Sequence, residues 1–411
     1  MTMKRIKRII GFICAGVALA TAQKAMAAES VSKQEQSEWL RWVIPLPKKI
    51  HISSKIELPA ADVKISLRQG AGDTEKNAAD QLIALFKEKS GADGSGDAFE
   101  ILMGVCDDGG KIGDVTLTDA VDLKNLPNRD QAYLIRPVGQ NRLVLTALDE
   151  RGVFYAVQTL RQLLESRFDK RTVTIPLVSV TDWPDMAQRG EWGEITWFPP
   201  DEMEWMASHK MNVVVYNVGF RIGEDGRGEV TDIYPERIAS ARRHALEMIP
   251  FIYHYSILGE STNLFEVYPH LNKGIAMSDD KVVRDLGEMD MKTVPCPSEP
   301  KMAEVLADFM CDIAKAGATE IDCWLTEGRR FQCPCDLCLG EGENMHYALE
   351  ARVFIKAWRI AQKQYPKLFV RITLTQGSRR SNDKVLAEVP RGVGVVYYAS
   401  SWTYNAMRQP M

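Results

Sequence analysis

The chain has 411 residues, a formal net charge of −4, and 45% hydrophobic and 26% charged residues. These values indicate a globular protein of about two domains, with enough apolar side chains for two cores. The charge balance includes no basic tail or stripe that would neutralise a phosphate backbone, so nucleic acid is excluded as an expected partner.

The first residues predict an export signal. An apolar run over residues 9–22 follows a cluster of basic residues, Lys4, Arg5, Lys7 and Arg8. The run is too short to span a bilayer, and residues 25–27 (AMA) form a small-x-small cleavage site. We therefore expect residues 1–27 to be a signal peptide and the protein to be periplasmic or extracellular, without stable membrane insertion. An uncleaved membrane anchor is the alternative.

The segment after the signal, residues 28–184, predicts a small α/β domain. Partial alternation of apolar residues predicts a strand over residues 51–67. One broad apolar face predicts a helix over residues 75–89, and another strand is expected over residues 99–105.

A hairpin and a second helix are expected next. Strands at 132–137 and 142–147 are separated by a four-residue turn signal. Asp149 can cap a helix whose apolar residues recur at helical spacing, so this helix should pack on the sheet. A last strand over 173–180 leads to Pro184, which closes the domain.

From Arg189 onward, strands and helices alternate, which favours a parallel sheet or a (β/α) barrel for residues 185–411. Six strands are expected, at 190–196, 212–218, 248–255, 320–325, 369–375 and 393–398. The helices between them are clearest at 303–316 and 348–364. Because a closed barrel needs eight strands, we expect an incomplete TIM-type barrel from a longer protein. A compact open sheet of six strands is the alternative.

The second helix of the first domain carries a family resemblance. Residues 149–163 (DERGVFYAVQTLRQL) resemble the helix of the small zincin-like α+β domain in glycoside hydrolase family 20, the β-N-acetylhexosaminidases. Residues 182–184 (DWP) and 189–190 (RG) resemble the family's junction into the first barrel strand. Related domains also precede the barrels of hyaluronidase-like and α-glucuronidase enzymes, so the resemblance implies the architecture more than the substrate.

Two stretches of the second domain extend this resemblance. Residues 296–300 (CPSEP) are similar to the motif that opens the helix before the fourth strand, and residues 321–327 (IDCWLTE) lie where that strand and its catalytic Asp-Glu pair would be. The resemblance implies that Glu327 is the general acid. Thr326 stands where the family has the aspartate that steadies the acetamido group, and residues 196–197 (TW) stand where it has a sugar-binding arginine.

Polar and aromatic side chains follow the predicted strands, where the active sites of barrels lie. Aromatic faces pack against sugar rings and carboxylates bind hydroxyls, so this set suits a carbohydrate. Some of these aromatic residues can equally belong to the barrel core. The expected substrate-binding residues are Trp197, Tyr216, His254, Trp324, Tyr398 and Trp402.

Glycosidic cleavage needs a carboxylic acid that protonates the leaving oxygen, and a second group that stabilises positive charge at the anomeric carbon. Glu327 is the candidate acid, unless it pairs with Arg329 or Arg330 in a loop. Glu194 or Asp322 is expected to serve as nucleophile or base.

Three cysteines, Cys333, Cys335 and Cys338, follow the candidate acid within a few residues. They are expected to bind a structural zinc ion, with His346 or Cys323 as the fourth ligand of a tetrahedral site. A disulfide between Cys335 and Cys338, or one with Cys323, is the alternative in an oxidising compartment. No cofactor is expected to be required for catalysis.

Taken as a whole, the pattern predicts an exported, β-N-acetylhexosaminidase-like glycoside hydrolase. It would cleave a terminal sugar from an oligosaccharide or glycoconjugate by carboxylic general acid catalysis. A catalytically inactive carbohydrate-binding barrel is one alternative, because Thr326 replaces the family's aspartate. An α-glucuronidase-like hydrolase with the same first domain is another, and a fragment inactive because its barrel does not close is a third.

Overall fold

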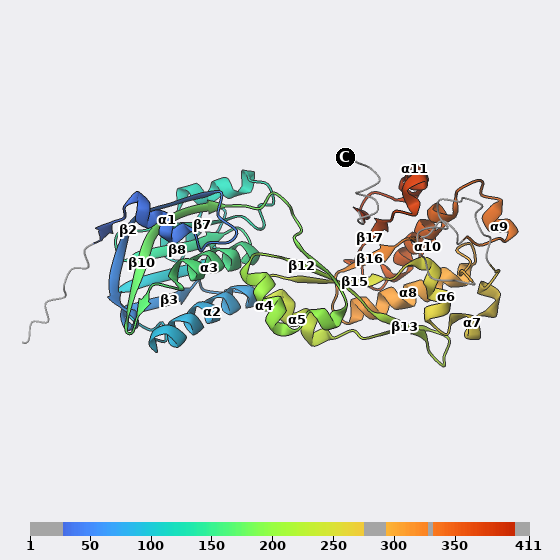
Figure 1. Cartoon of the computed structure of the whole chain (residues 1–411), viewed down its shortest axis with the longest axis horizontal. Helices are drawn as coiled ribbons and strands as arrows, with labels where there is room; N and C mark the ends of the chain where they lie inside the picture. Colours follow the sequence, from blue (N-terminus) through green and yellow to red (C-terminus); the bar gives the residue numbers. More distant parts are fainter. Residues whose placement is uncertain (1–27, 275–292, 328–331, 399–411) are drawn as a thin grey trace, which may run out of the picture.

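The structure is a computed structural model that describes residues 28–274, 293–327 and 332–398. The described chain forms two domains that lie end to end, the first reaching Asp182 and the second starting at Gly190 (Figure 1). The predicted signal peptide lies outside the described residues. Within those residues, no helix combines the length and the apolar character that crossing a membrane requires.

The first domain is built on one mixed sheet, with strand order β1-β2-β10-β7-β8-β4-β3 and β9 beside β10. The strands are β1 Glu29–Ser30, β2 Lys49–Pro59, β3 Val63–Leu67, β4 Phe99–Val105, β7 Tyr133–Pro137, β8 Arg142–Ala147, β9 Phe168–Asp169 and β10 Thr172–Asp182. The helices are α1 Lys33–Leu40, α2 Asp73–Ser90 and α3 Glu150–Leu164.

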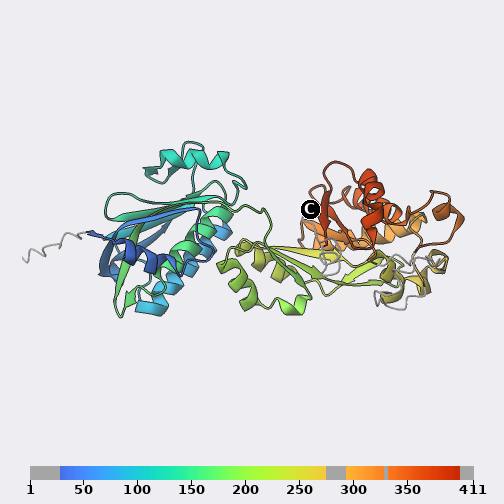
Figure 2. The same cartoon turned by 45° about the horizontal axis from the view of Figure 1, so that its top comes forward.

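The two faces of this sheet are covered differently (Figure 2). Helices α2 and α3 pack on one face and share its large apolar core. The other face is covered by the segment that holds β5 Lys111–Ile112, β6 Val115–Thr116 and the 3-10 helix η2 Thr118–Asn125. The central strands β4 and β8 are therefore buried on both sides, whereas β2 keeps one face exposed.

Helix α3 begins and packs as the sequence predicts. Asp149 accepts a hydrogen bond from the backbone N–H of Arg151 (3.0 Å) and so caps the first turn. Gly152 lets the helix approach the sheet, because a Cβ at this position would lie 2.5 Å from the carbonyl oxygen of Ala132. The run that carries the family resemblance is therefore a helix whose close packing on β7 needs a glycine.

The prediction of one strand over residues 51–67 is wrong. This segment forms β2 and β3, which are separated by the 3-10 turn η1 Ala60–Asp62 and lie at different places in the sheet. The buried residues occupy even positions up to Ala60 and an odd position at Val63. Since side chains alternate along a strand, one continuous strand would place Val63 on the face opposite the core. The other strands and both helices predicted for this domain are confirmed, with small differences at their ends.

The second domain contains six parallel strands in the order β11-β12-β15-β16-β17-β18. They are β11 Gly190–Gly193, β12 Val213–Asn217, β15 Glu247–Ile252, β16 Glu320–Trp324, β17 Phe369–Leu374 and β18 Gly394–Tyr397. Each of the six predicted strands is thus confirmed. The larger helices are α4 Pro200–Ser208, α5 Pro235–Arg243, α8 Pro300–Lys315, α10 His346–Ala361 and α11 Asn382–Glu388.

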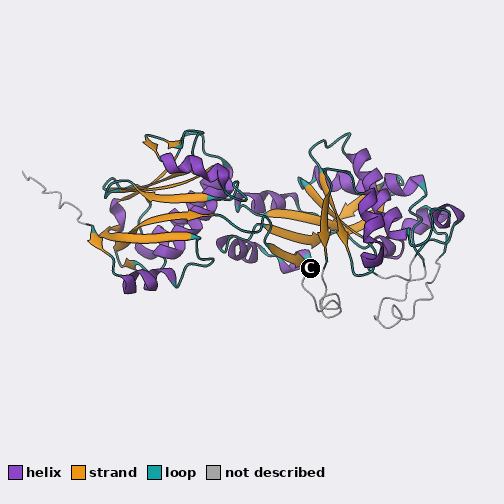
Figure 3. Cartoon of the chain, turned by 90° about the horizontal axis from the view of Figure 1, so that it is seen from above, coloured by secondary structure: helices purple, strands orange, loops and turns teal. Residues whose placement is uncertain are grey.

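These helices flank the strands (Figure 3) and share one core with one face of the sheet. The apolar cluster on the other face contains strand residues and the residues just after them, with no helical residue. Strands in chain order with helices on a single face form part of a TIM-type barrel, whereas a doubly wound open sheet carries helices on both faces. The six strands in the described part of the chain are therefore a half-barrel.

Several smaller elements in the loops were not predicted. A hairpin of β13 Gly219–Ile222 and β14 Gly228–Thr231 follows β12. Short helices lie after β15 and β16, namely α6 Leu258–Ser261, α7 Leu264–Val267 and α9 Asp336–Leu339. The remaining 3-10 turns are η3 Ile195–Trp197, η4 Tyr255–Ile257, η5 Pro269–Leu271 and η6 Ser378–Ser381.

The two domains contact each other through the start of α2 and the end of α5. The hydroxyl of Thr74 donates to the carbonyl of Arg242 (3.1 Å), and the amide of Asn77 donates to the carbonyl of Arg243 (2.8 Å). Both carbonyls precede β15, so the first domain touches the second at the amino ends of its strands.

A buried ion pair closes the junction between the domains. The ammonium of Lys210 lies 3.2 Å from Oδ2 of Asp182 and donates to the hydroxyl of Tyr133 (2.7 Å), which in turn donates to Asp182 (2.9 Å). Lys210 is only 4% exposed, and burial lowers its pKa to about 8, although Asp182 opposes this shift. The charge of Lys210 is therefore costly to bury and depends on Asp182.

Replacing Lys210 should weaken this junction strongly. We expect Lys210→Met to lower the free energy of unfolding by about 3 kcal/mol, because the Asp182 carboxylate is left buried without its cation. Urea denaturation of the full chain measures the change. Lys48→Met is the matched control, since Lys48 pairs with Asp185 at the surface and the substitution should cost less than about 1 kcal/mol. Equal losses in both variants would contradict the prediction.

Candidate active site

Glu327 lies at the carboxyl edge of the half-barrel, just after β16. His254 follows β15 and Gln376 follows β17, so the parallel sheet brings these three residues together. Oε1 of Glu327 lies 3.3 Å from Nε2 of His254, and Oε2 accepts a hydrogen bond from the amide of Gln376 (3.0 Å). The Glu327 side chain keeps 26% of its surface exposed, so it is held by neighbours but open to a ligand.

The backbone before Glu327 is fixed by a buried carboxyl from α10. The N–H of Thr326 donates to Oε2 of Glu350 (2.9 Å), and the Thr326 hydroxyl donates to Oε1 (2.8 Å). The same hydroxyl accepts from the N–H of Ser256 (3.1 Å), and the carbonyl of Thr326 accepts from the hydroxyl of Thr375 (2.7 Å). Thr326 is thereby tied to three separate segments of the domain.

Glu350 is a titratable group in an unusual environment. It is 2% exposed, and burial raises its pKa to about 8, while the two hydrogen bonds from Thr326 act in the opposite direction. A pKa in this range leaves most of the carboxyl protonated near pH 7. Glu350 thus contributes hydrogen-bonding oxygens to Thr326 with little buried negative charge.

Gly377 completes the contacts around the candidate acid. A Cβ on this residue would lie 2.0 Å from the carbonyl oxygen of Glu327 and 2.5 Å from the hydroxyl of Tyr347. Only a glycine lets the loop after β17 come this close to the loop after β16.

Aromatic rings cover the open face of the half-barrel beside Glu327. This aromatic group consists of Trp192, Phe251, Tyr253, His254, Trp324 and Tyr398. The ring of Trp324 is central: it stacks on Trp192 (5.5 Å between centroids, 23° between planes) and on His254 (5.4 Å, 27°). Trp192 remains 43% exposed, so part of the group offers a flat apolar surface to a ligand.

A second carboxylate, that of Glu194, acts electrostatically on the aromatic group. The pKa of Tyr253 is raised, first by burial and then by the negative charges of Glu327 and Glu194. The pKa of Tyr398 is also raised, by burial and by Glu327. Glu194 follows β11 and is exposed. The site therefore combines two carboxylates with an aromatic surface.

Asp322 is enclosed within the sheet. It is 2% exposed, lies 3.0 Å from Nε of Arg371 and accepts a hydrogen bond from the hydroxyl of Thr373. Burial raises its pKa, although Arg371 opposes the shift. Arg371 also pairs with Glu320 (3.3 Å) at the start of β16. The carboxylate of Asp322 is thus engaged by neighbouring strand residues.

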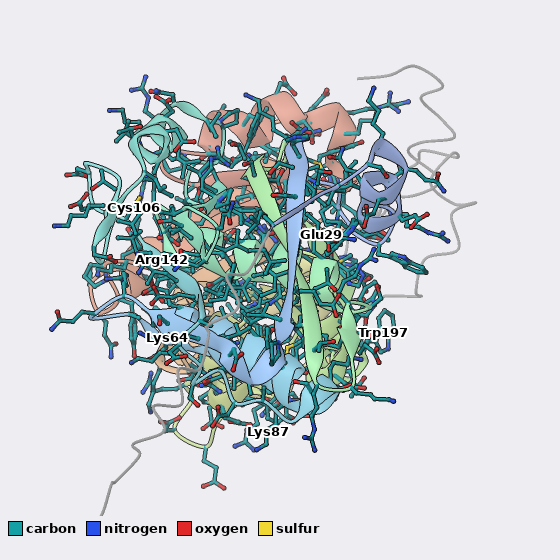
Figure 4. All side chains as sticks on the ribbon, turned by 90° about the vertical axis from the view of Figure 1, so that its left-hand side faces the viewer. Glu29, Lys64, Lys87, Cys106, Arg142 and Trp197 are labelled. Atoms are coloured by element: carbon teal, nitrogen blue, oxygen red, sulfur yellow. The ribbon has the colours of Figure 1, made fainter. Side chains whose placement is uncertain are left out.

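The other predicted substrate-binding residues are distributed unevenly. His254, Trp324 and Tyr398 belong to the aromatic group. Tyr216 is fully buried in the core between the sheet and the helices, on the face opposite the aromatic group. Trp197 lies in η3, is 60% exposed and points to the outside of the molecule (Figure 4). Trp402 lies outside the described residues.

Three important residues were missed by sequence reasoning. Trp192 lies two positions before Glu194 on β11, and Tyr253 lies two positions after Phe251, so strand alternation contained the signal for both. Glu350 is a carboxylate on the buried stripe of a predicted helix, and that polar residue on an apolar face was the available sign. Arg329 and Arg330, the proposed partners of Glu327, lie outside the described residues.

The three clustered cysteines come together with a fourth that was not predicted as a ligand. Cys333, Cys335 and Cys338 lie with Cys296, and their sulfur atoms are all within 4.8 Å of one another. Cys323 is instead fully buried in the core between the sheet and the helices. His346, the other residue predicted as a fourth ligand, is not in this group of residues.

Comparison with known proteins identifies the first domain. Residues 41–183 match the family model described as glycosyl hydrolase family 20, domain 2. A comparison with curated proteins found no match.

Solved structures match both domains together. A family 20 β-N-acetylhexosaminidase from Streptomyces coelicolor A3(2) is 16% identical, with a TM-score of 0.54 over 87% of this chain and 75% of that one. A chitobiase from Flavobacterium johnsoniae is 13% identical, with a TM-score of 0.57 over 88% of this chain and 59% of that one. A β-N-acetylhexosaminidase from Bacteroides fragilis NCTC 9343 is 16% identical, with a TM-score of 0.57 over 89% and 72%.

The chain thus spans from 59% to 75% of the length of these three structures. At such identities the likeness shows the fold alone. The first domain matches family 20 domain 2 and the chain shares the fold of these structures, so it is similar to glycoside hydrolases of family 20.

Proposed function

We propose that the protein is a glycosidase that cleaves a terminal sugar from an oligosaccharide or glycoconjugate, with Glu327 as the general acid. The observation that carries this proposal is the position of Glu327 at the carboxyl edge of the half-barrel, between His254 and Gln376. Active sites of barrels lie at this edge. The aromatic group beside Glu327 provides the flat apolar surface on which a sugar ring can pack.

In this proposal, Glu327 donates a proton to the glycosidic oxygen as the bond breaks. Gln376 donates to Oε2 and so directs Oε1 toward the leaving group and His254. After the aglycone departs, the water that completes hydrolysis returns a proton to Glu327, while His254 holds Oε1 in place. Both neighbours are positioned by the ends of adjacent strands, which favours one orientation of the acid.

Glu194 is the better candidate for the second catalytic group. Its carboxylate is exposed and, like that of Glu327, raises the pKa of Tyr253. Asp322 is enclosed by Arg371 and Thr373, so a substrate would have to displace an ion pair to reach it. We therefore assign the stabilisation of positive charge at the anomeric carbon to Glu194.

Thr326 supports a second candidate function, a carbohydrate-binding protein without catalysis. A threonine offers no carboxylate to an acetamido group. Its hydroxyl and N–H also both donate to Glu350, so neither is free to bind a sugar. Such a protein would bind glycans through the aromatic group and leave them intact.

We also propose that residues 1–27 direct export, which N-terminal sequencing of the secreted protein tests.

Glu327→Gln should strongly slow hydrolysis while leaving glycan binding unchanged. We expect kcat on aryl glycosides to fall by at least about 100-fold, the usual contribution of a general acid. The substrates to compare are N-acetylhexosaminides, hexosides and glucuronides, because Thr326 leaves the sugar class open. Calorimetric titration with the reactive sugar measures binding to both forms.

Glu224→Gln is the matched control for this substitution, since Glu224 is exposed beside the β13–β14 hairpin. It should retain full activity. Glycan binding with no hydrolysis by the parent protein on the whole panel would favour the binding protein over the enzyme.

Glu350 should give the protein a measurable pH dependence. Its pKa is raised from 4.5 to about 8, so between these values only the unfolded chain releases the proton. The stability that Glu350 contributes is therefore fully present below about pH 4.5 and is lost as the pH rises to about 8. Urea denaturation at several pH values should show a steeper loss for the parent protein than for Glu350→Gln.

A matched control and a second readout separate positioning from general stability. Glu304→Gln removes an exposed carboxylate on α8 and should leave the pH dependence unchanged. Glu350→Ala, which removes the acceptors for Thr326, should lower kcat by about tenfold with little change in KM. Identical pH profiles for the parent protein and Glu350→Gln would contradict the role of this carboxyl.

A further inference from the structure

Four cysteine sulfurs from distant parts of the chain meet behind the candidate active site. This sulfur group consists of Cys296, Cys333, Cys335 and Cys338. Cys296 lies just before α8, whereas the other three lie after β16 and at the start of α9. Cys296, Cys333 and Cys338 are at most 7% exposed, so the group is closed to solvent on most sides.

The spacing of the sulfur atoms suits one tetrahedral metal ion. The Sγ of Cys296 lies 3.6 Å from the Sγ of Cys335 and 3.6 Å from that of Cys338. A zinc–sulfur bond of about 2.3 Å implies about 3.8 Å between sulfurs at the corners of a regular tetrahedron. A disulfide instead needs about 2.05 Å, and all the described cysteines are free thiols.

We propose that the sulfur group is a structural zinc site in which four thiolates bind one ion. Zinc replaces the four thiol protons, which leave to solvent, and no electron is transferred. The hydroxyl of Ser298 lies 3.1 Å from the Sγ of Cys338 and then donates a hydrogen bond to that thiolate. Four protein ligands leave no open position, so the ion is structural.

The site joins three segments that also define the candidate active site. The N–H of Cys296 donates to the carbonyl of Leu271 (3.0 Å), which ties the site to the loop after β15. Leu349 of α10 packs against the sulfur group, and its neighbour Glu350 holds Thr326. Bound zinc therefore restrains the loops on both sides of Glu327 without contacting the substrate.

Metal analysis of the full chain, purified without chelator, tests this proposal independently of any glycosidase activity. Elemental analysis should find about one zinc per chain, and Cys296→Ser should reduce this to a small fraction, because three thiolates bind zinc more weakly. Cys311→Ser is the matched control, since Cys311 is a half-buried thiol on α8 outside the sulfur group. It should retain one zinc.

Two measurements on the parent protein keep the test decisive if Cys296→Ser does not fold. Denaturation with a chelator should release the zinc and expose all four cysteines as free thiols. Reconstitution with Co²⁺ should give the sulfur-to-metal charge-transfer absorption of a tetrathiolate site. Absence of stoichiometric zinc, with two disulfides in unreduced peptides from the sulfur group, would overturn the proposal, as would iron in place of zinc.

Discussion

The contact between Glu350 and Thr326 determines how the candidate active site is held. A buried carboxyl must have its oxygens satisfied, and Thr326 supplies a donor to each of them. Because Thr326 immediately precedes Glu327, the direction of this candidate acid is set by α10, which packs on the helix side of the sheet. The close approach of Gly377 to the Glu327 carbonyl restricts the same backbone from the opposite side.

The same contact gives a physical reason for the departure from the family pattern. An aspartate at position 326 would place a second carboxyl against that of Glu350, and two carboxyls sharing a site disfavour ionisation of both. Threonine avoids this conflict, since its hydroxyl donates to Glu350 and accepts from the N–H of Ser256. Residue 326 therefore serves the interior of the domain, and in the proposed function the sugar is recognised by the aromatic group and Glu194.

The sequence predicted the elements of the fold better than the contacts of the site. All six strands of the half-barrel were predicted because buried parallel strands are short, apolar and separated by helices. In the first domain, the buried positions shift by one residue after Ala60, just past the end of β2, and this shift was overlooked. At the site, strand ends pointed to Glu327 and His254. Chain position alone does not reveal that Tyr216 faces the helices or that Asp322 is engaged by Arg371. Cys296 lies 37 residues from Cys333, so only the folded chain joins them.

The first domain is attached to the second at the end remote from Glu327. Thr74 and Asn77 bind carbonyls that precede β15, and Asp182 binds Lys210, which precedes β12. The described residues of the loops at the carboxyl edge are consequently free of these inter-domain contacts. Changes in those loops can alter which glycan is accepted while the joint between the domains stays intact, so ligand preference and assembly can diverge separately in the course of evolution.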